Sequence, residues 1–155
     1  MAAELCRRGL LATPFSGNVP HYDIIASGQF GGHLAIQVKA VNGATWQFDI
    51  SSFVEIRMDG PRQVMGKLKP EPYPGLICVL VALKEHGRDL FFILEWKDLQ
   101  AILVTNHSAY LGKHGGMRPK AHMSTHISLA VDDVEAFEGR WKSILQHVVT
   151  DASGE

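Results

Sequence analysis

Three side chains in the first third of the 155-residue chain carry groups that suit metal-assisted hydrolysis of a phosphodiester bond. Asp23 offers a carboxylate, Gln37 an amide oxygen and Lys39 an ammonium group. Magnesium prefers hard oxygen ligands, so Asp23, the Gln37 side chain and the Val38 backbone carbonyl form a candidate metal set. Lys39 could orient a water molecule or stabilise charge on the phosphoryl group. Glu4, on the expected first helix, is a further candidate for the active site and for the metal.

Two neighbouring strands are expected to bring these groups together. Residues 22–26 and 34–41 are predicted strands, joined by a glycine-containing turn that favours a hairpin. Side chains alternate along a strand, so Gln37 and Lys39 point to one face while the residue between them points into the core. The hairpin partner can then bring Asp23 beside them.

The whole pattern predicts a single mixed α/β (α+β) domain over residues 1–155, with a mixed central sheet flanked by helices. Residues 59–74 form an expected loop, because proline at such density cannot occupy central strands or helix interiors. The last helix has the clearest apolar periodicity, and Asp132 with Glu135 fits a capping box at its start. The expected elements are helix 1–8, strands 22–26, 34–41, 45–50, 76–83 and 90–96, and helices 98–107 and 134–148.

Composition excludes several classes of protein. The 15 Lys and Arg balance 16 Asp and Glu, so any attraction to nucleic acid needs a local patch. A hydrophobic content of 46% excludes wholesale disorder. The longest apolar run, residues 76–83, has the length of a strand and is too short to cross a membrane. No signal peptide is visible and two cysteines are too few for a disulfide scaffold, which predicts a reduced, cytoplasmic location.

The first third of the chain resembles the core motif of the PD-(D/E)XK nuclease superfamily. That motif has an Asp in a strand, a glycine-containing turn, and then an acid or Gln, any residue and Lys, as in HYDIIASGQFGGHLAIQVKA. The preceding stretch is similar to the beginning of restriction-endonuclease-like and Holliday-junction-resolvase-like domains, where a helix carries a Glu. The resemblance implies a restriction-endonuclease-like αβββαβ core with Glu4, Asp23, Gln37 and Lys39 in the active site. Two positions depart from the motif: Tyr22 stands where Pro is usual, and Gln37 replaces the commoner acid.

The resemblance implies a metal-dependent endonuclease that hydrolyses DNA with magnesium-activated water, manganese being a substitute metal. It also implies a homodimer, by analogy with small domains of this superfamily that cut duplexes as dimers. Gln37 removes one negative charge from the metal set. That change favours an alternative, a catalytically inactive nuclease-fold module that binds nucleic acid or a protein partner. Hydrolysis of RNA is a third hypothesis for the function.

Two groups of cationic residues are candidate phosphate-contacting surfaces. Residues 99–131 contain no Asp or Glu, and a solvated loop normally mixes both signs of charge. The cationic residues of this acid-free stretch are Lys113, Arg118 and Lys120. The second group, around the proline-rich loop, holds Arg57, Arg62, Lys67 and Lys69. Chance clustering on a solvated loop is the alternative for both groups.

Simpler roles are open for several of these residues. Asp23 and Lys39 could form a structural ion pair, and Glu4 could be an ordinary solvated helix residue. The glycines of the turn do not have the spacing of a phosphate-binding loop, and they favour a hairpin instead. The histidines match no zinc-binding pattern, so the sequence predicts no zinc site.

Overall fold

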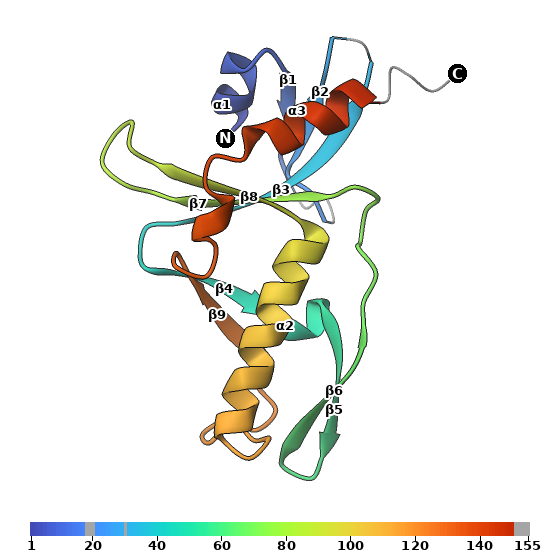
Figure 1. Ribbon diagram of the computed structural model, residues 1–155, viewed down its shortest axis with the longest axis vertical. Helices are drawn as coiled ribbons and strands as arrows, with labels where there is room; N and C mark the ends of the chain where they lie inside the picture. The colour runs from blue at the N-terminus through green and yellow to red at the C-terminus, as the bar shows by residue number, and fades with distance from the viewer. Residues whose placement is uncertain (18–20, 30, 151–155) are drawn as a thin grey trace.

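A computed structural model of the chain describes residues 1–17, 21–29 and 31–150, and its centre is a five-stranded mixed sheet (Figure 1). The strands lie in the order β1-β2-β3-β7-β8. Only the central pair, β3 and β7, runs parallel among these neighbours; the other pairs are antiparallel. The bounds are β1 Leu11–Pro14, β2 Ile24–Ser27, β3 His33–Val41, β7 Ile77–Ala82 and β8 Leu90–Glu95.

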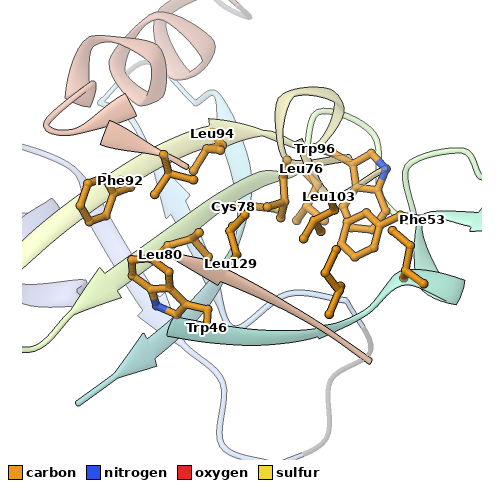
Figure 2. Close-up of a cluster of buried hydrophobic side chains, with 14 of the residues drawn as sticks. Trp46, Phe53, Leu76, Cys78, Leu80, Phe92, Leu94, Trp96, Leu103 and Leu129 are labelled. Atoms are coloured by element: carbon orange, nitrogen blue, oxygen red, sulfur yellow. The ribbon is translucent and has the colours of Figure 1, made fainter. Parts of the chain in front are cut away.

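Strand β7 lies at the centre of the core because its residues are apolar on both faces. All six of its residues are buried. The odd-numbered ones pack against the layer that holds α1 (Ala2–Arg7) and α3 (Trp141–Thr150). The even-numbered ones pack against α2 (Trp96–Lys113) and β4 (Thr45–Asp49), in the cluster that Figure 2 shows around Trp46, Leu80 and Trp96. Helices therefore flank both faces of the sheet.

Two small antiparallel pairs extend the α2 side of the molecule. Strand β4 pairs with β9 (His126–Ala130), and β5 (Val54–Asp59) pairs with β6 (Arg62–Leu68). Short 3-10 turns follow β4 and precede α3, namely η1 (Ile50–Ser52) and η2 (Glu135–Phe137). Among the described helices, none combines the length and the apolar character needed to cross a bilayer.

The five strands expected from the sequence are present, each within two residues of its predicted bounds. The prediction of a loop over residues 59–74 is wrong for its first half, where β6 forms. The reason is the position of the prolines: Pro61 lies in the hairpin turn and the other three follow the end of β6. Strands β1, β5 and β9 are additional elements that the sequence pattern did not indicate.

Both predicted C-terminal helices have different bounds from those expected. Helix α2 begins at Trp96 and continues to Lys113, so the glycine at position 112 falls in its last turn. The long helix expected over 134–148 is interrupted, because Gly139 has φ +62° and separates η2 from α3. The predicted capping box is also wrong, since neither Asp132 nor Glu135 caps a helix; η2 begins after Val134 without a side-chain cap.

The glycine-containing turn after β2 is present, and it also allows close packing. Gly28 donates its N–H to the carbonyl of Gly32 at 3.0 Å. A Cβ atom on Gly32 would lie 2.2 Å from the carbonyl oxygen of Val148. Helix α3 therefore approaches the backbone of this turn more closely than any side chain would permit.

Candidate active site

Asp23 lies directly before β2 and is hydrogen-bonded to both neighbouring strands. Its N–H donates to the carbonyl of Ile36 at 2.8 Å, and its carbonyl accepts the N–H of Phe15 at 2.9 Å. Its carboxylate oxygen Oδ2 accepts the N–H of Val38 at 2.7 Å. The antiparallel register of β2 and β3, continued by one residue, places Asp23 opposite Gln37.

Gln37 and Lys39 share the face of β3 that Asp23 also approaches. Val38, between them, packs against the opposite layer, as strand alternation requires. Asp23, Gln37 and Lys39 line one pocket of about 510 Å³, bounded also by the end of β4 and the start of α2. The structure thus brings together the three groups that the sequence placed in one site, and their catalytic roles stay a prediction.

The alternative of a structural ion pair between Asp23 and Lys39 does not hold. Within the described part of the chain, the ion pairs shorter than 4.0 Å join other residues. The ammonium of Lys39 lies instead 5.2 Å from the ring centroid of Phe48. Lys39 is therefore held at the pocket by a cation–π contact that leaves its donors available to a ligand.

A second carboxylate, Asp49, lines the same pocket. Its Oδ1 accepts the N–H of Ser51 at 2.9 Å and the hydroxyl of Ser51 at 2.7 Å, which caps η1. Burial acts to raise the pKa of Asp49, but hydrogen bonds from Ser51 and Thr125 and the charge of Lys69 hold it below its ordinary value. The sequence signal for Asp49, an acid two residues before Ser, indicates capping rather than chemistry.

Two further pocket residues were not indicated by the sequence pattern. His21 has φ +79°, a left-handed conformation that is uncommon for a residue with a side chain. Cys78 contributes to the buried side of the pocket, and burial raises the pKa of its thiol to about 12. A neutral thiol is neither a metal ligand nor a nucleophile, so Cys78 has a packing role.

The donor groups fit a hard divalent cation. Among the hydrogen bonds between described residues, none uses Asp23 Oδ1 or the Gln37 side chain. The N–H and carbonyl of a strand residue point to the same side, so the Val38 carbonyl faces the side on which Asp23 lies. The described residues contain no group of three or more His, Cys, Asp and Glu side chains placed for a metal. The set is therefore one carboxylate and two neutral oxygens.

Glu4 does not join this site, and that part of the prediction is wrong. Helix α1 packs on the opposite layer of the sheet, and β1, which follows it, begins beside Ser27, at the end of β2 that is remote from Asp23. The Glu4 carboxylate is paired with Arg8 at 2.6 Å and with Arg7 at 3.4 Å. The hydrogen bond from Arg8, with both arginine charges, holds the pKa of Glu4 below its ordinary value against the opposing effect of burial. Glu4 is thus a salt-bridged helix residue.

The two cationic groups lie beside each other, at the end of the molecule that contains the β5–β6 hairpin (Figure 1). Gln63 of β6 donates its N–H to the carbonyl of Gly116 at 2.9 Å, and Arg62 forms a bridge with Met117. The acid-free stretch and the hairpin are therefore parts of one surface. The exposed cationic residues of the two groups are Arg57, Arg62, Lys67, Lys69, Lys113 and Lys120.

Arg118 is less free than the other cations of this surface. Its guanidinium lies 5.2 Å from the ring centroid of Tyr110 and donates to the carbonyl of His126. On the hairpin, Asp59 lies opposite Arg62 in the strand register and on the same face as Arg57, so this face carries both signs of charge. Lys113 and Lys120 are consequently the cations with the least competition for a phosphate.

One buried polar contact joins the hairpin to α2 and to the acid-free stretch. Gln63, 4% exposed, donates from Nε2 to the carbonyls of His122 at 2.6 Å and Ser124 at 2.9 Å. Its Oε1 is left to accept, so the Nε2 of His107, 2.9 Å away, is the donor. Burial and the charge of Arg118 hold the pKa of His107 below its ordinary value.

We expect this contact to make the stability depend on pH. In the unfolded chain His107 takes up a proton below about pH 6.5, whereas the folded protein resists doing so. The free energy of unfolding should therefore be fully retained above pH 6.5 and fall as the pH decreases below it, by at most about 1.4 kcal/mol per pH unit. Urea titrations from pH 8 to pH 5 should show this loss in the wild type and a weaker one in His107→Gln. An equal pH dependence in His107→Gln would contradict it, and His86→Gln, in an exposed turn, is the control.

Comparison with known proteins gives one structural likeness. No family model matches the chain, and no curated protein matches it. The solved structure of a bacterial homing endonuclease, I-Ssp6803I, is similar over 98% of this chain and 90% of its own, with a TM-score of 0.53 and 15% identity. At that identity the likeness concerns the fold alone. The chain therefore has a nuclease-like mixed α/β fold, as the sequence predicted, and its place in the PD-(D/E)XK superfamily stays a prediction.

Proposed function

We propose that this chain is a metal-dependent endonuclease that hydrolyses phosphodiester bonds in DNA. The observation that carries the proposal is the meeting of Asp23, Gln37 and Lys39 in one pocket of a nuclease-like fold. A carboxylate, a neutral oxygen and an ammonium are the groups that such hydrolysis needs, at the spacing of the PD-(D/E)XK motif. The likeness to a homing endonuclease supports the same class of reaction.

Each group of the pocket has a separate part in this proposal. Asp23, the Gln37 side-chain oxygen and the Val38 carbonyl would hold magnesium, or manganese in its place. A divalent cation held there lowers the pKa of nearby water and neutralises charge on the phosphoryl group. The N–H of Val38 fixes one oxygen of Asp23, which keeps the carboxylate oriented. Lys39, with no carboxylate partner, is available to position the attacking water or to stabilise the charge that develops on the phosphate.

A plasmid-nicking assay tests the function directly. We expect supercoiled DNA to be relaxed in magnesium or manganese and to stay intact in chelator. Lys39→Ala should remove the activity, whereas Lys84→Ala, an exposed lysine in the turn between β7 and β8, should retain it. Activity that is equal in Lys39→Ala, or that persists in chelator, would exclude this pocket as its source. A matched RNA substrate decides between DNA and RNA.

A second function is favoured by the sparse donor set. The pocket offers a single carboxylate to the metal, because Glu4 lies elsewhere and Asp49 caps η1. A nuclease-fold module that binds nucleic acid or a protein partner without cleaving it would retain the cationic surface and lack activity. DNA binding in chelator, combined with no cleavage by the wild type in any divalent metal, would favour the non-cleaving binding module over the endonuclease.

The oligomeric state and the extent of the domain are further parts of the proposal. We propose one domain over residues 1–155, working as a homodimer, because two active sites are required to cut both strands of a duplex in one encounter. We also propose a cytoplasmic location, because both cysteines, exposed Cys6 and buried Cys78, are free thiols, as is usual in a reducing compartment. Equilibrium sedimentation of the protein with and without duplex DNA measures the oligomeric state.

Gln37→Glu should tighten metal binding. A second carboxylate adds a negative charge beside Asp23, so we expect the dissociation constant for magnesium to fall about tenfold, or about 1.4 kcal/mol. Gln47→Glu is the matched control, because Gln47 lines the same pocket from β4 and is already hydrogen-bonded to Thr45 and Ser128. Calorimetric titration should rank Gln37→Glu above the wild type and Asp23→Ala below it. Equal binding by all of these proteins would contradict a metal site at Asp23.

A further inference from the structure

Three aromatic side chains from separate segments form a continuous row beside the pocket. Phe15 follows β1, Tyr22 precedes β2, and Tyr73 belongs to the segment between β6 and β7. The ring centroids of Phe15 and Tyr22 are 5.6 Å apart, and those of Tyr22 and Tyr73 are 5.1 Å apart, both edge to face. Tyr22 is half-buried against the core, whereas Phe15 and Tyr73 are 42% and 39% exposed. We call these three residues the aromatic rim.

The aromatic rim adjoins the catalytic groups through the backbone. Phe15 donates its N–H to the carbonyl of Asp23 at 2.9 Å, and Tyr22 is the residue directly before Asp23. Tyr73 follows Pro72, which lines the same pocket as Asp23 and Lys39. A nucleotide whose phosphate occupies the pocket would therefore carry its base into the neighbourhood of this rim.

We infer that the aromatic rim stacks on an unpaired base next to the phosphate that is cleaved, so the preferred substrate is DNA with a single-stranded or splayed nucleotide at the cut. This inference rests on the proposed function. Exposed aromatic rings bind bases by stacking, which tolerates any sequence because every base has a π-face. Inside an intact duplex both faces of a base are covered by its neighbours, so a ring can reach only a base that has left the stack.

The position of the aromatic rim favours a base over a second protein as its occupant. Its two outer rings lie beside a pocket that Lys39 lines, and the charge of Lys69 acts on Asp49 in the same pocket. A phosphate and a base can therefore be bound together. The anchoring of Tyr22 in the core fixes the direction of the rings in advance, which reduces the entropy lost when a flexible strand binds. A protein surface would need to match both the aromatic rings and the adjacent cations.

Binding in chelator tests this inference without any cleavage. The probe is one fluorescently labelled oligonucleotide of mixed sequence, prepared as a single strand, as a splayed fork and as a blunt duplex, with affinity measured by anisotropy. Phe15→Ala and Tyr73→Ala should each weaken binding of the single strand and fork by about fivefold to 150-fold, the range reported by alanine substitution of stacking residues. Binding of the blunt duplex should change less than about twofold, because contacts to phosphates remain.

Matched variants separate stacking from other effects of the substitution. Tyr73→Phe keeps the ring and should bind like the wild type. Leu11→Ala, which removes an apolar side chain that is 72% exposed on β1, should also leave binding unchanged. Replacing single bases of the probe with abasic residues should weaken wild-type binding at one position, and Phe15→Ala or Tyr73→Ala should show no further loss there.

The outcomes distinguish this inference from the proposed function. Wild-type affinity of Phe15→Ala and Tyr73→Ala for the single strand and fork would overturn the stacking role, even if Lys39-dependent cleavage is observed. An equal loss for all three probes would also overturn it, as would dissociation of a dimer in these variants, which would make the aromatic rim a protein interface. Conversely, selective loss of single-strand binding in a protein that cuts nothing would support the aromatic rim and contradict the nuclease activity.

Discussion

Asp23→Asn is expected to lower the rate of DNA cleavage by about a thousandfold or more, with the fold intact. Asparagine has the same shape, and its side-chain oxygen can still accept the N–H of Val38, so thermal unfolding should be nearly unchanged. The substitution removes the one negative charge that the proposed metal set contains. A cation that stabilises the transition state by several kcal/mol is then lost, and each 1.36 kcal/mol corresponds to a factor of about ten in rate. Single-turnover cleavage in magnesium measures the effect.

Asp49→Asn is the matched control for this prediction, because both carboxylates line the same pocket. Asp49 is engaged by Ser51 and caps η1, and asparagine caps a helix about as well as aspartate, so its replacement should leave stability nearly unchanged and change the rate within about threefold. A loss of activity in Asp49→Asn as large as that in Asp23→Asn would mean that both carboxylates serve the reaction. The account of a site with a single carboxylate would then be wrong.

The second large effect is expected on DNA affinity. Alanine at Lys113, Arg118 and Lys120 should weaken binding of duplex DNA at low salt and flatten the dependence of log affinity on log salt by up to about 2.7, three contacts at about 0.9 each. Because Arg118 also contacts Tyr110 and the carbonyl of His126, the Lys113 and Lys120 pair should account for about two of these contacts. Filter binding in calcium or chelator at several salt concentrations measures the slope.

Controls for this experiment must carry the same change of charge. Alanine at Lys84, Lys97 and Lys142, exposed lysines outside the cationic surface, should leave the slope nearly unchanged. Exposed charges contribute little to stability, so both triple variants should remain folded. If only substitutions at Arg57, Arg62 and Lys67 weaken binding, the hairpin is the principal contact with DNA. If neither set matters, the nucleic-acid function is contradicted and a protein partner is favoured.

The sequence by itself determined the part of the site that depends on neighbouring strands. The alternation of Gln37, Val38 and Lys39 follows from the pleat of a strand, and a short glycine-containing turn leaves few ways to pair the next strand. The central strand was also predictable, because the apolar run 76–83 can be stable only where both faces are covered. These features depend on local geometry, which a single sequence records directly.

Only the tertiary structure decided where the distant groups lie. Glu4 lies away from Asp23 because α1 packs on the opposite layer of the sheet, where Leu5 is buried. No motif near Glu4 indicates this packing. The aromatic rim joins Tyr73 to Phe15 and Tyr22, which lie far earlier in the chain, and the end of β4 places Asp49 in the pocket. Such neighbours depend on which apolar faces pack together, and packing is non-directional and summed over the whole core. The spacing of residues along the chain therefore does not predict these neighbours, and only folding brings them to one site.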